Sequence, residues 1–193
     1  MNCNVSGVTI NKFTFAFQQL SGNYNNSIIT VSSSSVTTNA TLFGTTSYFL
    51  NVSVIIATLN VNGSSFSLLS NPNATATVIN CSFTAALINC SVGNVLLLFG
   101  HTNQSVVITN TFINATITSQ RSYYLTDSIN VLNATNVSIT GEIYSNLPFG
   151  AVCDSVASGF LKQIKMQVGV INQNATNGSS AVLVAQPFNQ SAF

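Results

Sequence analysis

Short segments in which apolar and polar residues alternate run along most of this chain. Residues 52–55 read Val-Ser-Val-Ile, residues 106–109 read Val-Val-Ile-Thr and residues 137–140 read Val-Ser-Ile-Thr. Segments of this kind are typical of β-strands with one buried face, because successive side chains of a strand point to opposite sides. Residues with a high helix propensity are sparse. The pattern therefore predicts an all-β protein.

Asparagines precede these segments at a nearly regular interval. The series starts at Asn4 and continues through Asn26, Asn51, Asn73, Asn94, Asn114 and Asn136. Six steps cover 132 residues, which gives a mean period of 22 residues. A period of this length indicates a repeat architecture, in which each unit buries its apolar face only by stacking on its neighbours.

This pattern resembles the right-handed parallel β-helix, a β-solenoid with coils of about this length. The resemblance covers roughly residues 4–145 and implies one domain, with solenoid coils over residues 1–145. Residues 146–193 would then form an irregular C-terminal coil or cap of the same domain, with an irregular coil or short helix at 159–166. A β-sandwich or jelly roll would also show alternating segments, and it is the alternative fold.

The repeated asparagines predict a ladder inside the solenoid. In a β-helix, the amide of one coil can bond to the equivalent amide of the next coil, at the strand spacing of about 4.8 Å. Asn26 and Asn94 occupy the repeated position without forming a glycan acceptor triplet, so the position itself favours an amide. We therefore expect a structural ladder of Asn26, Asn51, Asn73, Asn94, Asn114 and Asn136.

Charge is almost absent from the chain, which narrows the possible partners. Only 4% of residues are charged, against about 25% in an ordinary domain, and none lies between Lys12 and Arg121. A net charge of +1 gives no basic surface for nucleic acid or anionic lipid. The longest apolar runs, such as residues 95–99, fall far short of a membrane span. The first residues lack the features of a secretory signal peptide.

Acceptor triplets for N-glycosylation are unusually frequent. Fifteen Asn-x-Ser/Thr triplets occur, at Asn4, Asn25, Asn39, Asn51, Asn62, Asn73, Asn80, Asn89, Asn103, Asn114, Asn133, Asn136, Asn174, Asn177 and Asn189. N-glycans are bulky and solubilising, so they would hydrate a surface that lacks charge. We therefore predict an extracellular or cell-surface glycoprotein, with glycans favoured at exposed turns such as Asn39, Asn62, Asn103 and Asn177.

The four cysteines are predicted to form disulfides. Their number is even and the chain has the composition of an exported protein. Cys81 and Cys90 are the most plausible pair within one chain. Cys3 and Cys153 would then remain free or bond to a neighbouring subunit.

The acidic residues do not indicate a catalytic site. Hydrolysis of a polysaccharide requires two carboxylates across the scissile bond. Asp127, Glu142 and Asp154 are the only acidic residues, and each falls at a different position of the repeat. No catalytic carboxylate pair is therefore predicted.

The remaining candidates for chemistry are equally weak. His101 is the only histidine and follows a glycine, as a turn residue would. The chain has no nucleophile motif such as Gly-x-Ser-x-Gly, and Cys81, Cys90 and His101 match no common zinc-site spacing. We predict no catalytic residue, no metal and no cofactor.

The predicted function is that of a non-enzymatic, heavily N-glycosylated structural or adhesive protein, a subunit of a surface coat or filament that assembles with copies of itself through the solenoid ends. An alternative is a β-helix protein that binds or degrades polysaccharide, for which exposed Tyr48, Phe49, Tyr123 and Tyr124 would be the candidate binding residues.

A third hypothesis is an ice-binding solenoid with flat rows of threonine. Residues 75–77 and 116–118 each read Thr-x-Thr, but residues 95–97 of the intervening segment read Val-Leu-Leu. The row is thus interrupted, which makes this function the least favoured of the three.

Overall fold

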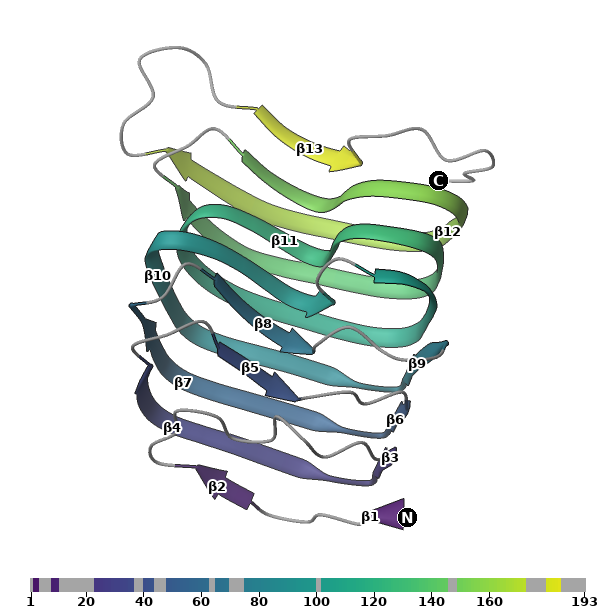
Figure 1. The fold of residues 1–193 in the computed structure, drawn as a ribbon, viewed down its shortest axis with the longest axis horizontal. Helices are drawn as coiled ribbons and strands as arrows, with labels where there is room; N and C mark the ends of the chain where they lie inside the picture. Colours follow the sequence, from purple (N-terminus) through teal and green to yellow (C-terminus); the bar gives the residue numbers. More distant parts are fainter. Residues whose placement is uncertain are drawn as a thin grey trace.

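The chain folds into an all-β solenoid (Figure 1). The computed structural model describes residues 2–3, 8–10, 23–36, 40–43, 48–62, 65–69, 75–99, 102–145, 149–172 and 180–184. Every pairing between the described strands is parallel. The predicted fold class is therefore confirmed, and the sandwich alternative does not apply.

Within the described ranges, thirteen strands form one continuous sheet that winds around the solenoid axis. They are β1 (Asn2–Cys3), β2 (Val8–Ile10), β3 (Asn23–Asn25), β4 (Ile28–Val36), β5 (Ala40–Phe43), β6 (Tyr48–Leu50), β7 (Ser53–Val61), β8 (Ser65–Leu69), β9 (Ala76–Ile79), β10 (Ser82–Phe99), β11 (Thr102–Ser145), β12 (Phe149–Asn172) and β13 (Ser180–Val184). The three longest, β10, β11 and β12, continue around the corners of the coil and thus contribute to more than one face.

Three rows of stacked strands make up the walls (Figure 1). The first row runs through β2, β4, β7, the start of β10 and successive parts of β11 and β12. The second row contains β1, β3, β6, β9 and other parts of β11 and β12. The third row contains β5, β8, the end of β10, further parts of β11 and β12, and β13.

The alternating segments place one side-chain set inside each coil. Ile29, Val54, Phe83, Ile113 and Ile139 occupy equivalent inward positions on the first row, and all are buried. Burying a side chain of this size contributes about 1.5 to 3 kcal/mol to folding. The stacked inward rows therefore supply much of the hydrophobic stabilisation of the core. This arrangement explains why the sequence alternates with a period of two.

Aromatic residues fill the N-terminal part of the described core. The rings of Tyr24 and Phe49 are stacked with their centroids 5.1 Å apart. Phe43 meets both rings edge to face, at 5.2 and 5.3 Å. Edge-to-face and offset contacts of this kind add stability beyond simple burial. Large rings fill this end of the described core, whereas smaller side chains such as Ala115 and Ala134 occupy buried positions farther along.

The repeat is longer than the sequence analysis predicts. Six residues at one corner of the coil share a positive φ: Asn26, Asn51, Asn80, Asn110, Asn136 and Gln163. Successive members are 25, 29, 30, 26 and 27 positions apart. The coil therefore has a period of about 27 residues, not 22. The shorter estimate arose because asparagines at other places of the coil were included in the series.

The described part of the C-terminal segment continues the solenoid. Residues 149–172 form β12, which pairs with β11 along most of its length. The short helix considered for residues 159–166 is therefore not formed. No helix occurs in the described ranges, and accordingly none there has the length and apolar character to cross a membrane.

Candidate functional site

A ladder of side-chain amides runs along one corner of the solenoid. The Nδ2 atom of each asparagine donates a hydrogen bond to the Oδ1 atom of the asparagine one coil earlier. The bonds are Asn51 to Asn26 (2.9 Å), Asn80 to Asn51 (3.2 Å), Asn110 to Asn80 (3.1 Å) and Asn136 to Asn110 (2.9 Å). The ladder thus links five consecutive coils on the outer surface, where all five side chains are exposed.

The corner selects asparagine because of its backbone conformation. The φ values of the five ladder residues lie between 49° and 54°, in the left-handed region that most L-residues avoid and that asparagine tolerates best after glycine. Gln163 takes the sixth corner with a φ of 53°. An asparagine here therefore serves twice, since it fits the left-handed turn and its amide bonds to the neighbouring coil.

The backbone N–H groups of the corner asparagines donate in the opposite direction to their side-chain amides. The N–H of Asn26 donates to Leu50 O at 2.9 Å, and the N–H of Asn51 donates to Ile79 O at 3.0 Å, so each bond goes to the following coil. The side-chain amides donate to the preceding coil. Each corner is therefore held from both sides by hydrogen bonds.

The ladder overlaps only partly with the predicted series. It contains Asn26, Asn51 and Asn136 of that series. Asn94 instead lies on the third row, beside Ser65 and Arg121, and Asn114 lies within a strand of the first row, so their placement in the ladder was wrong. The predicted rung Asn73 is outside the described residues.

Two ladder residues, Asn80 and Asn110, were missed. A corner asparagine joins two strands, so a buried residue stands two positions before it and another three positions after it. Around Asn110 these residues are Ile108 and Ile113, both fully buried. A search for this spacing, rather than for an asparagine before one apolar segment, would have found both residues.

A second amide contact lies at the far end of the first row. Asn89 Nδ2 donates to Asn60 Oδ1 at 3.3 Å, and the two residues are register partners in β10 and β7. Asn89 Oδ1 is buried and has no hydrogen-bond partner. Asn89 begins an acceptor triplet, but its side-chain amide is hydrogen-bonded to the neighbouring coil.

The predicted glycan acceptors divide into four sets in the structure. The side chains of Asn51, Asn62, Asn80 and Asn136 are exposed, and those of Asn25, Asn89, Asn114 and Asn133 are partly exposed. Asn103 lies in β11, but its side chain is not described. The remaining acceptors are outside the described residues: Asn4, Asn39, Asn73, Asn174, Asn177 and Asn189.

Cys81 and Cys90 are not joined by a disulfide. Nine positions separate them, most of them in the extended strand β10. At about 3.3 Å per residue their Cα atoms are roughly 25 to 30 Å apart, whereas a disulfide requires less than about 7 Å. The predicted pair is therefore wrong. Cys3 lies in β1 and Cys153 in β12, but their side chains are not described.

Cys81 replaces a hydroxyl residue in a repeated turn contact. Ser27 Oγ donates to Asn25 O at 2.9 Å, and Thr111 Oγ1 donates to Thr109 O at 3.0 Å. Cys81 occupies the same position of its coil, and its Sγ lies 3.2 Å from Ile79 O. Burial raises the pKa of the Cys81 thiol, although backbone hydrogen bonds oppose this shift. A buried, protonated thiol is a poor nucleophile, so Cys81 has a structural role.

The described residues bring no acidic cluster together. Among them, no group of three His, Cys, Asp or Glu residues could hold a metal ion. Glu142 is exposed on β11. The side chains of Asp127 and Asp154 are not described, and neither is His101.

Among the described residues, Tyr144 and Glu142 form a polar pair that shifts the pKa of the tyrosine. Tyr144 Oη donates to Glu142 Oε2 at 2.8 Å on the outer surface. This hydrogen bond, and next the carboxylate charge, raise the pKa of the Tyr144 phenol. Because the folded-state pKa is raised, the pair stabilises the fold below about pH 10, the ordinary tyrosine value. That contribution is lost as the pH rises through the folded-state pKa.

This pair gives a testable alkaline titration. We expect the ultraviolet difference titration between the wild-type protein and Tyr144→Phe to show a phenol that ionises above the ordinary tyrosine range. Glu142→Gln removes the charge, and the phenol should then ionise at a lower pH. An unchanged midpoint in Glu142→Gln would contradict the contact.

The aromatic residues proposed for polysaccharide binding do not form an exposed group in the described structure. Phe49 is buried in the core and stacked on Tyr24. Tyr48 is partly exposed on the second row. The side chains of Tyr123 and Tyr124 are not described. The prediction of Phe49 as a surface binding residue is therefore wrong.

A continuous threonine row is also not formed beside Thr77. Its register partners in the neighbouring coils are Tyr48 and Val107. Thr118, the last residue of the other Thr-x-Thr segment, pairs with Asn89. These pairings do not provide the regular hydroxyl row of an ice-binding face.

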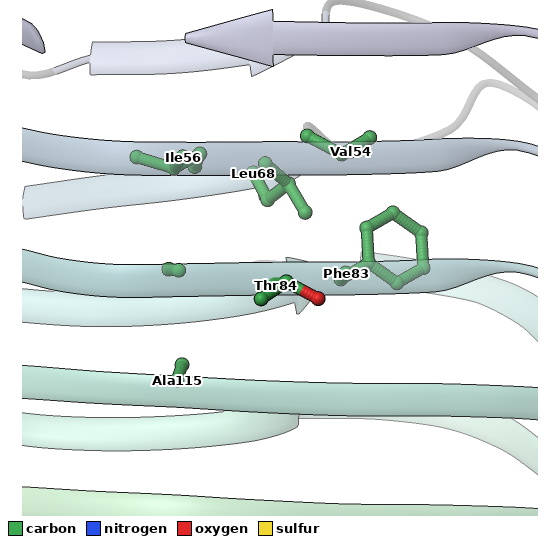
Figure 2. A pocket seen from close by; sticks show the side chains of 7 residues that line it. Val54, Ile56, Leu68, Phe83, Thr84 and Ala115 are labelled. Carbon is green, nitrogen blue, oxygen red and sulfur yellow. The ribbon is translucent and has the colours of Figure 1, made fainter. Parts of the chain in front are cut away.

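A small cavity lies between neighbouring coils (Figure 2). Its volume is about 10 Å³. It is lined by Val54, Ile56, Leu68, Phe83, Thr84, Ala85 and Ala115. This space holds at most about one water molecule, whereas ligand pockets measure roughly 300 to 1,000 Å³. The cavity is a gap in core packing and not a ligand site.

Comparison with protein-family models, with curated protein sequences and with solved structures found no match to this chain. The candidate site is therefore defined by the structure itself. Its two elements are the exposed amide ladder and the edges of β2 and of residues 158–172 in β12 that pair with no other described strand.

Proposed function

We propose that this protein is a non-enzymatic, extracellular structural glycoprotein, a subunit of a surface coat or filament whose solenoid stacks end to end on a second copy. The observation that carries the proposal is an incompletely covered row of apolar side chains on the last described coil. Glycans on exposed asparagines would keep the nearly uncharged lateral walls in solution.

The apolar row consists of Ile164, Met166 and Val168 in β12. All three pack against the core but remain partly exposed. The register partners of Ile164 and Met166 one coil earlier are Val137 and Ile139, which are buried. A further coil placed over β12 would bury the row in the same way.

Unpaired strand edges at both ends of the described sheet could pair with a second copy of the protein. Residues 158–172 of β12 pair with β11, and no described strand pairs with their other edge. At the opposite end of the described sheet, β1 pairs only with β3 and β2 only with β4. Open strand edges are templates for pairing. A second copy is the favoured partner because its coil has the cross-section that continues several rows at once.

Two lysines lie on the last described coil. Lys162 and Lys165 are exposed there, and edge lysines oppose unwanted strand pairing. Both side chains are at outward positions, so their ammonium groups can stay in water when a coil is added.

Sedimentation velocity of the full chain tests this proposal. We expect the wild-type protein to form species larger than one subunit as its concentration rises, and Met166→Glu to weaken association at least about tenfold, since a carboxylate would enter the contact. Gln167→Glu is the matched control, because it adds the same charge at the neighbouring exposed position and should retain more of the association. A wild-type protein that stays monomeric at every concentration would contradict the proposal.

The lateral surface supports the glycoprotein part of the proposal. Exposed or partly exposed acceptor asparagines occur on β3, β10 and β11 and in the turns that flank β7 and precede β10. The outward positions of the first row in β4 and β7 include Thr30, Ser35, Ser53 and Asn60 beside exposed Ile28 and Ile55, and none of them is charged. Sugars would hydrate such walls and prevent lateral pairing of the solenoids, while the coil ends remain available for stacking.

A further inference from the structure

Two acceptor asparagines are consecutive residues of the amide ladder. Asn51 and Asn80 each begin an Asn-x-Ser triplet, and Asn80 Nδ2 donates to Asn51 Oδ1 at 3.2 Å. Building on the proposed glycoprotein function, we propose that Asn51 and Asn80 are mutually exclusive glycosylation sites, so that a folded molecule carries a glycan on one of them or on neither.

The chemistry of attachment permits a glycan on a single ladder residue. Transfer forms a bond between Asn Nδ2 and the anomeric carbon of the sugar, while the bond from that carbon to the phosphate group of an activated glycosyl donor breaks. The amide loses one proton and the phosphate departs with the bonding electrons. One N–H remains on Nδ2, and in Asn51 it can still donate to Asn26 Oδ1, at the 2.9 Å separation of the ladder.

The position of the second hydrogen explains the exclusion. In each ladder amide one N–H points along the solenoid axis toward the preceding coil, so the other points outward to solvent, where both side chains are exposed. Glycans on Asn51 and Asn80 would therefore leave the surface in parallel, one strand spacing of about 4.8 Å apart.

That spacing is too small for two branched glycans. Non-bonded carbon atoms approach no closer than about 3.5 Å, and a pyranose ring with its substituents is wider than the space that remains. Two rings fit only if they stack face to face, and the branches of a bulky glycan prevent such stacking beyond the first sugars. A doubly modified chain must break the ladder bond between Asn51 and Asn80 to relieve the crowding.

Asn136 provides an internal comparison. It also begins an Asn-x-Ser triplet on the ladder, but its neighbours are Asn110 and Gln163, and neither of these residues is in an acceptor triplet. A glycan on Asn136 therefore has no competing glycan one coil away. Its occupancy should be independent of the other two sites.

The test is secretion of the full chain from a eukaryotic cell line, with site occupancy measured by mass spectrometry of the glycopeptides. Tryptic cleavage leaves both residues on one peptide, because no Lys or Arg lies between Lys12 and Arg121. We expect molecules modified at both sites to be at least fivefold rarer than the product of the two single occupancies predicts.

Single variants distinguish competition between the two sites from a low intrinsic reactivity of either asparagine. Ser82→Ala abolishes the Asn80 triplet without changing a ladder amide and should raise the occupancy of Asn51; Ser53→Ala should raise that of Asn80. Ser138→Ala, which abolishes the Asn136 triplet, is the control and should change neither. Double modification at the level of independent sites would overturn the exclusion, and so would an absence of glycan from both sites in every variant.

Different results would overturn the exclusion of double modification and the proposed function. Protein from its natural source that carries no glycan at any asparagine would overturn the glycoprotein proposal. Frequent double modification in the secreted chain would overturn the exclusion alone, because it shows that the protein is glycosylated but that the ladder spacing does not limit it.

Discussion

Gly141→Ala is expected to destabilise the fold by about 3 to 5 kcal/mol, from the combined cost of a strained backbone and an overfilled contact. Gly141 has a φ of 134°, which L-residues rarely adopt. A Cβ atom at this position would overlap the carbonyl oxygen of Ala115 in the preceding coil. The neighbouring backbone cannot yield without breaking strand pairing, so the cost is large.

Thermal unfolding checks this expectation. For a chain of this size the midpoint should fall by roughly 10 °C. Gly159→Ala should behave similarly, because its φ is 138° and its Cβ would overlap Leu132 O. Gly169→Ala is the matched control, since its Cβ would make only an ordinary contact with Glu142 Cγ at 3.8 Å. Equal midpoints for Gly141→Ala and Gly169→Ala would contradict the coil spacing described above.

Asn80→Ala is expected to cost about 2 to 4 kcal/mol, from two lost ladder bonds and a disfavoured left-handed backbone. Asn80 donates to Asn51 and accepts from Asn110, so its removal interrupts the ladder at its centre. Its φ is 53°, which alanine adopts only with strain. Chemical denaturation, with the free energy of unfolding as the readout, measures the loss.

Two further variants separate the two contributions to that loss. Asn80→Gly removes the amide but tolerates the left-handed backbone, so it should cost about half as much as Asn80→Ala. Asn62→Ala, at an exposed asparagine outside the ladder, should change stability by less than about 0.5 kcal/mol. If Asn80→Ala and Asn62→Ala have the same effect, the ladder does not stabilise the coils.

The sequence predicted the type of fold because its physical cause is local. Alternation and β-branched side chains in segments such as 137–140 indicate strands directly, and repeated segments that cannot bury a face alone indicate stacking. The period was wrong because asparagine is abundant throughout the chain. Residue type alone does not distinguish a corner residue such as Asn110 from a strand residue such as Asn114.

Features set by the approach of neighbouring coils could not be predicted. The need for glycine at 141 arises from Ala115, 26 positions away, and depends on an exact register that the sequence does not reveal. The Cys81–Cys90 prediction failed for a related reason, because nearness in sequence places two residues far apart when the chain between them is extended. The αL corner at Gln163 likewise follows from the stacking and not from its side chain.

Electron microscopy of the full chain at increasing concentration tests the central claim, that the protein is a subunit that stacks through its solenoid ends, most directly. We expect rods longer than one subunit, of uniform width, with an axial repeat of about 4.8 Å from the stacked strands running continuously across the joints between subunits. Discrete particles one subunit long at every concentration, or rods joined side by side, would contradict it.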